Sequence, residues 1–122
     1  MNKKILLVDD SQTILMMERM ILTKGPYELV TASNGEEAVT KAFAEKPDLI
    51  LMDVMMPKMN GFEACRRIRS DEATKKTPII MVTTRGEVQN VEMGFESGCN
   101  DYVTKPINTT ELLSKLRNYL GD

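Results

Sequence analysis

The residues best suited to chemistry in this sequence are carboxylates, hydroxyls and one lysine, and each follows a short apolar run. These side chains are Asp9 and Asp10 after the run 4–8, Asp53 after 48–52, Thr83 and Thr84 after 79–82, and Thr104, Lys105 and Pro106 after 101–103. The sequence contains no histidine, which excludes His-based zinc sites, Ser-His and Cys-His nucleophile pairs and imidazole proton shuttles. Any chemistry must therefore use carboxylates, hydroxyls, lysine or a hard metal ion.

The carboxylates predict a magnesium site if the runs before Asp9 and Asp53 are neighbouring strands. Carboxylates packed together resist ionisation unless a positive charge enters. Oxygen ligands without His or Cys favour Mg²⁺, or Mn²⁺, over zinc. Such a crevice suits phosphoryl transfer, in which Asp53 is the nucleophile and Thr83 and Lys105 hold the phosphoryl oxygens.

The elements that must position these residues alternate between strand and helix along the chain. The apolar runs 4–8, 28–31, 48–52, 79–82 and 101–103 are typical of buried parallel strands. Helical spacing follows each run: first in the segment that Asp10 or Ser11 caps and Gly25-Pro26 ends, then at 35–44, 61–69 and 87–96, and last in a helix capped by Asn108 or Thr109. Five strand-helix units are too few for an eight-unit barrel, so we expect an α/β fold with an open, doubly wound parallel sheet.

The pattern also predicts which side chains face the core. The inward sets are Ile14, Leu15, Met17, Ile21 and Leu22; Ala38, Val39, Ala42 and Phe43; Phe62, Cys65 and Ile68; and Leu112, Leu113, Leu116 and Leu120. The ten methionines are scattered over many elements, which favours core filling over a metal site or a partner groove. We expect Cys65 and Cys99 to be buried free thiols.

Length and composition describe one soluble domain spanning 1–122, with no linker or second domain. The chain has 122 residues and a net charge of −2. Its pI near 5.3 and its lack of a basic cluster argue against nucleic acid as a partner of this domain. No apolar run approaches the roughly 20 residues of a membrane span, the first apolar run is too short for a secretory leader, and we expect no disulfide framework from two cysteines. We therefore expect a cytoplasmic protein that does not bind membranes.

These residues together resemble the receiver domain of bacterial two-component response regulators. The resemblance lies in Asp9-Asp10, the segment 53–61 (DVMMPKMNG), Thr83 and Lys105-Pro106, and it covers the whole chain in order. It implies a flavodoxin-like three-layer sandwich, (βα)5, with strand order 2-1-3-4-5. In that order the first and third strands are neighbours, which brings the carboxylates together.

The resemblance also implies a role for each acidic residue. Asp53 is implied to accept a phosphoryl group from a sensor histidine kinase. Asp10, Asp53 and the backbone carbonyl of Met55 are implied to bind Mg²⁺, and Asp9 to act on it through water. Lys105 is implied to pair with Asp53 and then with the phosphate.

A switch is implied as well. Thr83 moves toward the phosphate and Tyr102 rotates inward, while Pro106 is a cis proline. The changed surface, formed by the helix 87–96, the strand 101–103 and the last helix, then binds a downstream target or output domain. Candidate contact residues are Gln89, Met93, Tyr102 and Ile107. On this reading the protein is a signalling switch that catalyses only its own phosphorylation and dephosphorylation, and is not a metabolic enzyme.

Three alternatives remain beside this interpretation. An aspartyl-phosphate phosphatase resembles it but has the pattern Asp-x-Asp, and Met55 stands where the acid would be. A mononucleotide-binding flavodoxin would need a phosphate loop where Asp9-Asp10 stand. A receiver fold that binds partners without phosphorylation is disfavoured only because every acceptor-site residue is present. We also expect Thr84 and Arg85, with Met55, to slow the access of water to the acyl phosphate.

Overall fold

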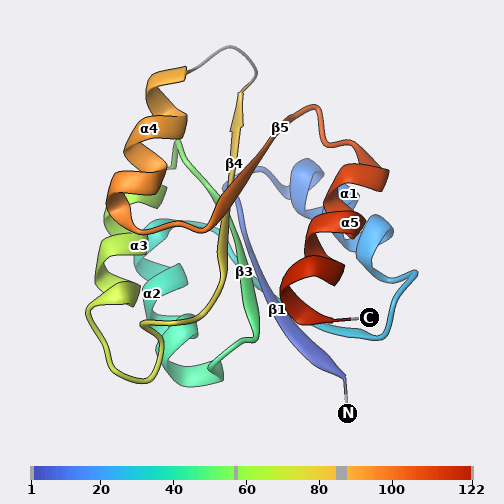
Figure 1. The fold of residues 1–122 in the computed structure, drawn as a ribbon, viewed down its shortest axis with the longest axis horizontal. Coiled ribbons are helices and arrows are strands. Elements are labelled where there is room, and N and C mark those ends of the chain that lie inside the picture. Colours follow the sequence, from blue (N-terminus) through green and yellow to red (C-terminus); the bar gives the residue numbers. More distant parts are fainter. Residues whose placement is uncertain (1, 57, 85–87, 122) are drawn as a thin grey trace.

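The chain forms a five-stranded parallel sheet covered by helices on both faces (Figure 1). The computed structural model describes residues 2–56, 58–84 and 88–121, with the side chains at 84 and 88–91 outside the described part. The strands are β1 (Lys3–Val8), β2 (Tyr27–Ala32), β3 (Leu49–Asp53), β4 (Ile79–Thr84) and β5 (Asp101–Lys105). The helices are α1 (Gln12–Leu22), α2 (Gly35–Glu45), α3 (Gly61–Arg69), α4 (Val88–Ser97) and α5 (Thr109–Leu120).

The sheet has the order β2-β1-β3-β4-β5, with every neighbouring pair parallel, which confirms the expected fold. The order reverses at β1, because β2 lies on one side of it and β3 on the other. In open α/β sheets the crevice beyond the carboxyl ends of the strands, next to such a reversal, is where ligands bind. β1 and β3 pair as far as Val8 and Met52, so the residues that follow them enter this crevice side by side.

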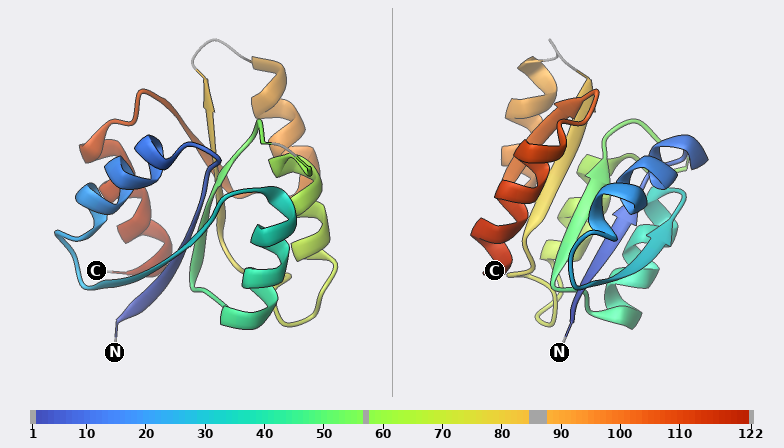
Figure 2. Two further views of the ribbon diagram at one scale, coloured as in Figure 1. Left: turned by 180° about the vertical axis from the view of Figure 1, so that it is seen from behind. Right: turned by 90° about the vertical axis from the view of Figure 1, so that its right-hand side faces the viewer.

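Two apolar layers hold the helices against the sheet. Helices α1 and α5 cover one face, and α2, α3 and α4 cover the other (Figures 1 and 2). Successive side chains of β1 point to opposite faces of the sheet. Leu7 packs in the layer of α1 and α5, whereas Leu6 and Val8 pack in the layer of α2, α3 and α4. Both faces are buried, which explains why the central strands are apolar at nearly every position.

Side-chain caps fix where four of the helices begin. Ser11, Asn34, Asn60 and Asn108 each accept a hydrogen bond from the backbone N–H three residues ahead, at 2.8 to 3.3 Å. Asn108 rather than Thr109 therefore caps α5. The predicted range 61–69 for α3 is confirmed residue for residue, whereas the predicted strands mostly differ by one or two residues at an end.

Two residues predicted to face the core are exposed. Met17 is 40% exposed and Phe43 is 38% exposed. In α1 the buried residues are Leu15, Glu18 and Leu22, and Met17 lies beside this stripe, about 100° around the helix from Glu18. Phe43 lies similarly beside the buried Ala42 of α2.

The prediction that methionines fill the core is correct for only part of the set. Met52 and Met81 are buried, as predicted, and Met56 and Met59 pack against the core. The exposed methionines are Met16, Met17, Met20, Met55 and Met93. Cys65 and Cys99 are buried free thiols, as expected. Among the described helices, none has the length and apolar character needed to cross a membrane.

Candidate functional site

Three carboxylates meet in the crevice at the carboxyl ends of β1 and β3. Asp9, Asp10 and Asp53 each offer one oxygen atom, and these oxygens lie within 4.8 Å of one another. Asp9 and Asp53 are only 1% and 4% exposed, whereas Asp10 faces solvent. The site is therefore closed on the side of the buried Asp9 and Asp53 and open to solvent at Asp10, where an ion or a phosphoryl donor can enter.

Backbone N–H groups fix the two buried carboxylates. The N–H of Ser11 donates to Asp9 Oδ1 at 2.9 Å, and the N–H of Val54 donates to Asp53 Oδ1 at 3.0 Å. Both donors belong to the turns that follow the strands, so the same turns that end β1 and β3 orient the acids.

Lys105, the last residue of β5, reaches the carboxylates from across the sheet. Its Nζ donates to Asp53 Oδ1 at 3.1 Å and lies 3.4 Å from Asp9 Oδ2. The contact with Asp9 is an ion pair that lacks hydrogen-bond geometry. Asp9 Oδ2 is therefore buried without a hydrogen bond from any described residue. The peptide bond between Lys105 and Pro106 is cis.

The two buried acids have raised pKa values, and burial is the main cause. Burial, followed by the charge of Asp9, raises the pKa of Asp53 to about 6 despite the opposing effect of Lys105. Burial also raises the pKa of Asp9. Burial alone would lower the pKa of Lys105, but Asp53 and Asp9 outweigh it, and this pKa lies above its usual value. A further cation would relieve the remaining repulsion.

Two glycines allow the loop after β3 to lie close to the site. A Cβ atom on Gly61 would collide with the backbone carbonyl of Asp53, and one on Gly35 would collide with the carbonyl of Met59. The N–H of Gly61 also donates to the carbonyl of Val54 at 2.9 Å. The start of α3 is therefore pressed directly against Asp53.

The other predicted site residues lie around this centre. Thr83 is buried near the end of β4 and pairs in register with Thr104 of β5. Met55 lies in the loop after Asp53, and its side chain is 72% exposed at the rim. Arg85 and the side chain of Thr84, which we expect to influence water access, lie outside the described residues.

Sequence reasoning missed one acidic residue near the site, Glu18 of α1. It is 1% exposed, and the charges of Asp9, Lys105 and Asp53 all act on it. Burial, with the charge of Asp9 next in size, raises its pKa to about 8. The spacing of Leu15 and Leu22 could have revealed it, because Glu18 lies on the same helical stripe.

Comparison with known proteins identifies the family. The family model of the response regulator receiver domain matches residues 5–117. This chain belongs to the receiver domain family. Among relatives, the receiver is 42% identical over 120 residues to the alkaline phosphatase synthesis transcriptional regulatory protein PhoP of Bacillus subtilis, covering 98% of this chain and 49% of PhoP. The chain spans about half the length of the curated relatives it matches first.

Solved structures agree with this assignment. A putative response regulator from Chloroflexus aurantiacus superposes with a TM-score of 0.95 at 35% identity, with both chains fully covered. The receiver domain of the sensor histidine kinase PA1611 from Pseudomonas aeruginosa superposes with a TM-score of 0.92 at 31% identity, again over both whole chains. That structure holds a magnesium ion in its active-site cleft.

The structure describes the side chains of three of the four candidate contact residues, Met93, Tyr102 and Ile107. Tyr102 packs edge to face against Phe95, with ring centroids 6.2 Å apart, and Lys115 Nζ lies 5.7 Å from the Tyr102 ring centroid. Met93 and Phe95 are exposed on α4. Ile107 packs in the layer of α1 and α5 and lines a groove with Met17 and Met20. The side chain of Gln89 lies outside the described part.

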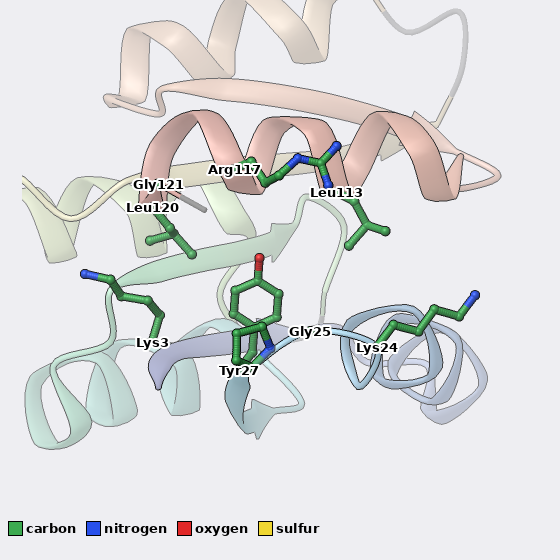
Figure 3. Close-up of a pocket in the computed structure, with 9 residues that line it drawn as sticks. Lys3, Lys24, Gly25, Tyr27, Leu113, Arg117, Leu120 and Gly121 are labelled. Carbon is green, nitrogen blue, oxygen red and sulfur yellow. The ribbon is translucent and has the colours of Figure 1, made fainter. Parts of the chain in front are cut away.

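A second pocket, of about 300 Å³, lies at the other end of the strands, where β1 and β2 begin. Lys3 and Tyr27, the first residues of β1 and β2, line it together with Arg117 of α5 (Figure 3). The side chains of Lys3 and Lys24 extend in opposite directions there, so their charges do not converge on one point. This pocket is separate from the carboxylate site.

Proposed function

We propose that this receiver domain is a phosphorylation-activated switch whose acceptor is Asp53. The observation that carries the proposal is the contact between Lys105 Nζ and Asp53 Oδ1, 3.1 Å, within a cluster of three carboxylates. A buried carboxylate held by an ammonium group is oriented for nucleophilic attack on phosphorus, and the same ammonium group can then neutralise phosphoryl oxygens. Thr83, buried near the end of β4, is proposed as the hydroxyl that binds these oxygens.

The donor set fits Mg²⁺ as the cofactor of this step. Asp9, Asp10 and Asp53 supply only oxygen atoms, and Asp9 Oδ2 is buried without a hydrogen bond from the described residues. The magnesium ion in the cleft of the PA1611 receiver supports the same assignment here. Mg²⁺ would be held by Asp10, Asp53 and the backbone carbonyl of Met55, with Asp9 acting through water, and it would neutralise negative charge on the phosphoryl group.

In the proposed reaction one oxygen of Asp53 attacks the phosphorus atom of a phosphohistidine on a sensor histidine kinase. The P–N bond breaks, its electron pair stays on the imidazole nitrogen, and that nitrogen takes up a proton. The product is an acyl phosphate on Asp53, which water later hydrolyses to the free carboxylate and phosphate. The protein therefore catalyses only its own modification, which is why we class it as a switch and not as an enzyme.

The signal leaves through a protein contact in this proposal. Phosphate on Asp53 adds negative charge next to Lys105 and Thr83, and these lie in β5 and β4, the strands that carry and adjoin Tyr102. Met93 and Phe95 present apolar surface beside Tyr102, which suits a downstream protein or an output domain. We place this switch in the bacterial cytoplasm, without nucleic acid or membrane as a direct partner of this domain.

Intact-mass measurement tests the proposal. The protein is incubated with Mg²⁺ and a small acyl-phosphate donor, and we expect one base-labile phosphoryl adduct. Asp53→Asn and a sample with EDTA should show none, and Asp48→Asn serves as the matched control because Asp48 lies at the other end of β3. An adduct on Asp53→Asn would refute the acceptor assignment, and no adduct on the folded wild type would favour a binding module that works without phosphorylation.

A further inference from the structure

Glu18 lies on the same face of the sheet as the acceptor site. Its neighbours on the inward stripe of α1, Leu15 and Leu22, pack in the apolar layer between the sheet, α1 and α5. Val103 of β5 packs in that layer too, and side chains alternate along a strand, so Lys105, two residues on, extends from the same face. Leu7 and Leu51 place Asp9 and Asp53 on this face by the same rule.

The carboxyl group of Glu18 is buried without a hydrogen-bond partner. Both of its oxygen atoms are inaccessible and accept no hydrogen bond from the described residues. A buried acid is ordinarily paired, and an unpaired one opposes folding. Leucine would continue the stripe of Leu15 and Leu22 without this penalty, so packing does not explain a glutamate at this position.

Lys105 is the cation whose charge acts on Glu18 in the described structure. Its ammonium group is at present shared by Asp53 Oδ1 and Asp9 Oδ2. A divalent cation in the Asp9, Asp10 and Asp53 cluster would require these same oxygens and would repel the ammonium group. Lys105 has a long flexible side chain. The carboxyl group of Glu18 lies on its own side of the sheet, and it becomes an acceptor for the ammonium group when the approach of that positive charge makes it release its proton.

We propose that Glu18 is a positioning residue for Lys105, providing the acceptor to which the ammonium group turns when a divalent cation occupies the carboxylate cluster. The inference rests on the proposed function, because it assumes that Mg²⁺ binds this cluster. Glu18 keeps the lysine neutralised and close to Asp53, so that it remains available for the phosphoryl oxygens. The phosphoacceptor site thus has a fourth acid, which acts on it only through Lys105.

A double-mutant cycle on Mg²⁺ affinity tests the proposal. Calorimetric titration with Mg²⁺ alone is performed on the wild type, Glu18→Leu, Lys105→Met and the double variant. Without Glu18 the ion must displace an ammonium group that has no second acceptor, so Glu18→Leu should lower the affinity about fivefold. In the Lys105→Met background the same change should have an effect of less than about twofold. Glu18→Gln, which keeps one acceptor oxygen, should recover part of the loss.

Matched controls separate this effect from net charge. Glu45→Gln removes a carboxylate that lies 3.0 Å from Lys4, at the opposite end of β1 from the site, and should leave Mg²⁺ affinity unchanged. Unchanged affinity in both Glu18 variants would overturn the proposal. An equal loss with and without Lys105 would also overturn it, because Glu18 would then act on the ion directly. If the wild type binds no Mg²⁺, the proposed function fails first.

Discussion

At the scale of single residues, several carboxylates of the site lie near a single positive charge, the ammonium group of Lys105. Lys105 is shared by Asp53 and Asp9, and this one ammonium group leaves the pKa of Asp53 raised to about 6. Glu18 adds a further acid to the same region and has no hydrogen-bond partner among the described residues. Such an arrangement opposes folding, which is a common feature of functional sites.

Glu18→Leu should therefore stabilise the protein, and more so at alkaline pH. Burial raises the pKa of Glu18 from 4.5 to about 8, so between these values the folded chain holds a proton that the unfolded chain has released. The free energy of unfolding consequently falls as pH rises through this window. We expect the variant to gain about 2–4 kcal/mol near pH 8 in urea unfolding without Mg²⁺, and less near pH 5.

Glu18→Gln separates charge from burial in this experiment. Like Glu18→Leu, this variant should lack the pH dependence of stability that Glu18 gives the wild type. Its gain in the free energy of unfolding should be smaller than that of Glu18→Leu, because a buried amide still lacks hydrogen-bond partners. If the wild type and Glu18→Leu unfold with equal free energy at both pH values, Glu18 is not a buried proton-holding acid.

At the scale of elements, the residues that end each strand and begin each helix position the chemistry. The sequence predicted α3 correctly because Phe62, Cys65 and Ile68 repeat at helical spacing, and the structure shows that Asn60 caps its start. It also predicted that the acids follow strands β1 and β3. The adjacency of those strands could not be read from local pattern, since parallel strands are joined by crossovers, and it came from the family resemblance.

The sequence failed where a polar residue occupies an inward position. Hydrophobicity alone placed Met17 in the core of α1 and left Glu18 outside it, but Glu18 is on the stripe and Met17 beside it. Phe43 was misplaced similarly, because the small residues Ala38 and Ala42 form the buried stripe of α2. The contact of Lys105 with Asp53, 52 positions apart in the sequence, was implied by the family resemblance, and the structure confirms it at 3.1 Å.

Gly61→Ala tests how closely α3 is pressed against the end of β3. The added methyl group would meet the carbonyl oxygen of Asp53, so α3 or the end of β3 must shift. We expect a loss of about 2–3 kcal/mol in the free energy of unfolding, measured in urea, together with slower phosphorylation by the acyl-phosphate donor.

The matched control for Gly61→Ala is Gly94→Ala in α4. There the added atom would lie 3.2 Å from Cys99 Sγ, a side chain that can yield, and alanine also favours a helix interior. This change should be close to neutral. Equal effects of the two substitutions would show that the contact with Asp53 is not what requires glycine at 61.

At the scale of the whole molecule, the fold and the proposed metal site should be thermodynamically linked. Strands β1 and β3 bring the acids within 4.8 Å of one another only in the folded chain, so on the proposed function Mg²⁺ would bind the native state and not the unfolded one. A ligand at ten times its dissociation constant stabilises by about 1.4 kcal/mol. For a chain of this length that corresponds to a rise of about 3–6 °C in melting temperature.

Calorimetric melting with and without Mg²⁺ measures this linkage, with NaCl at equal ionic strength as the control for screening. Asp10→Asn removes the exposed ligand of the cluster while leaving the buried pair of Asp9 and Lys105 in place, so it should abolish most of the rise. A rise that NaCl reproduces, or one that persists in Asp10→Asn, would mean that Mg²⁺ acts on surface charge in general. A rise confined to the intact cluster would tie the stability of the whole sheet to the three acids that its strand order brings together.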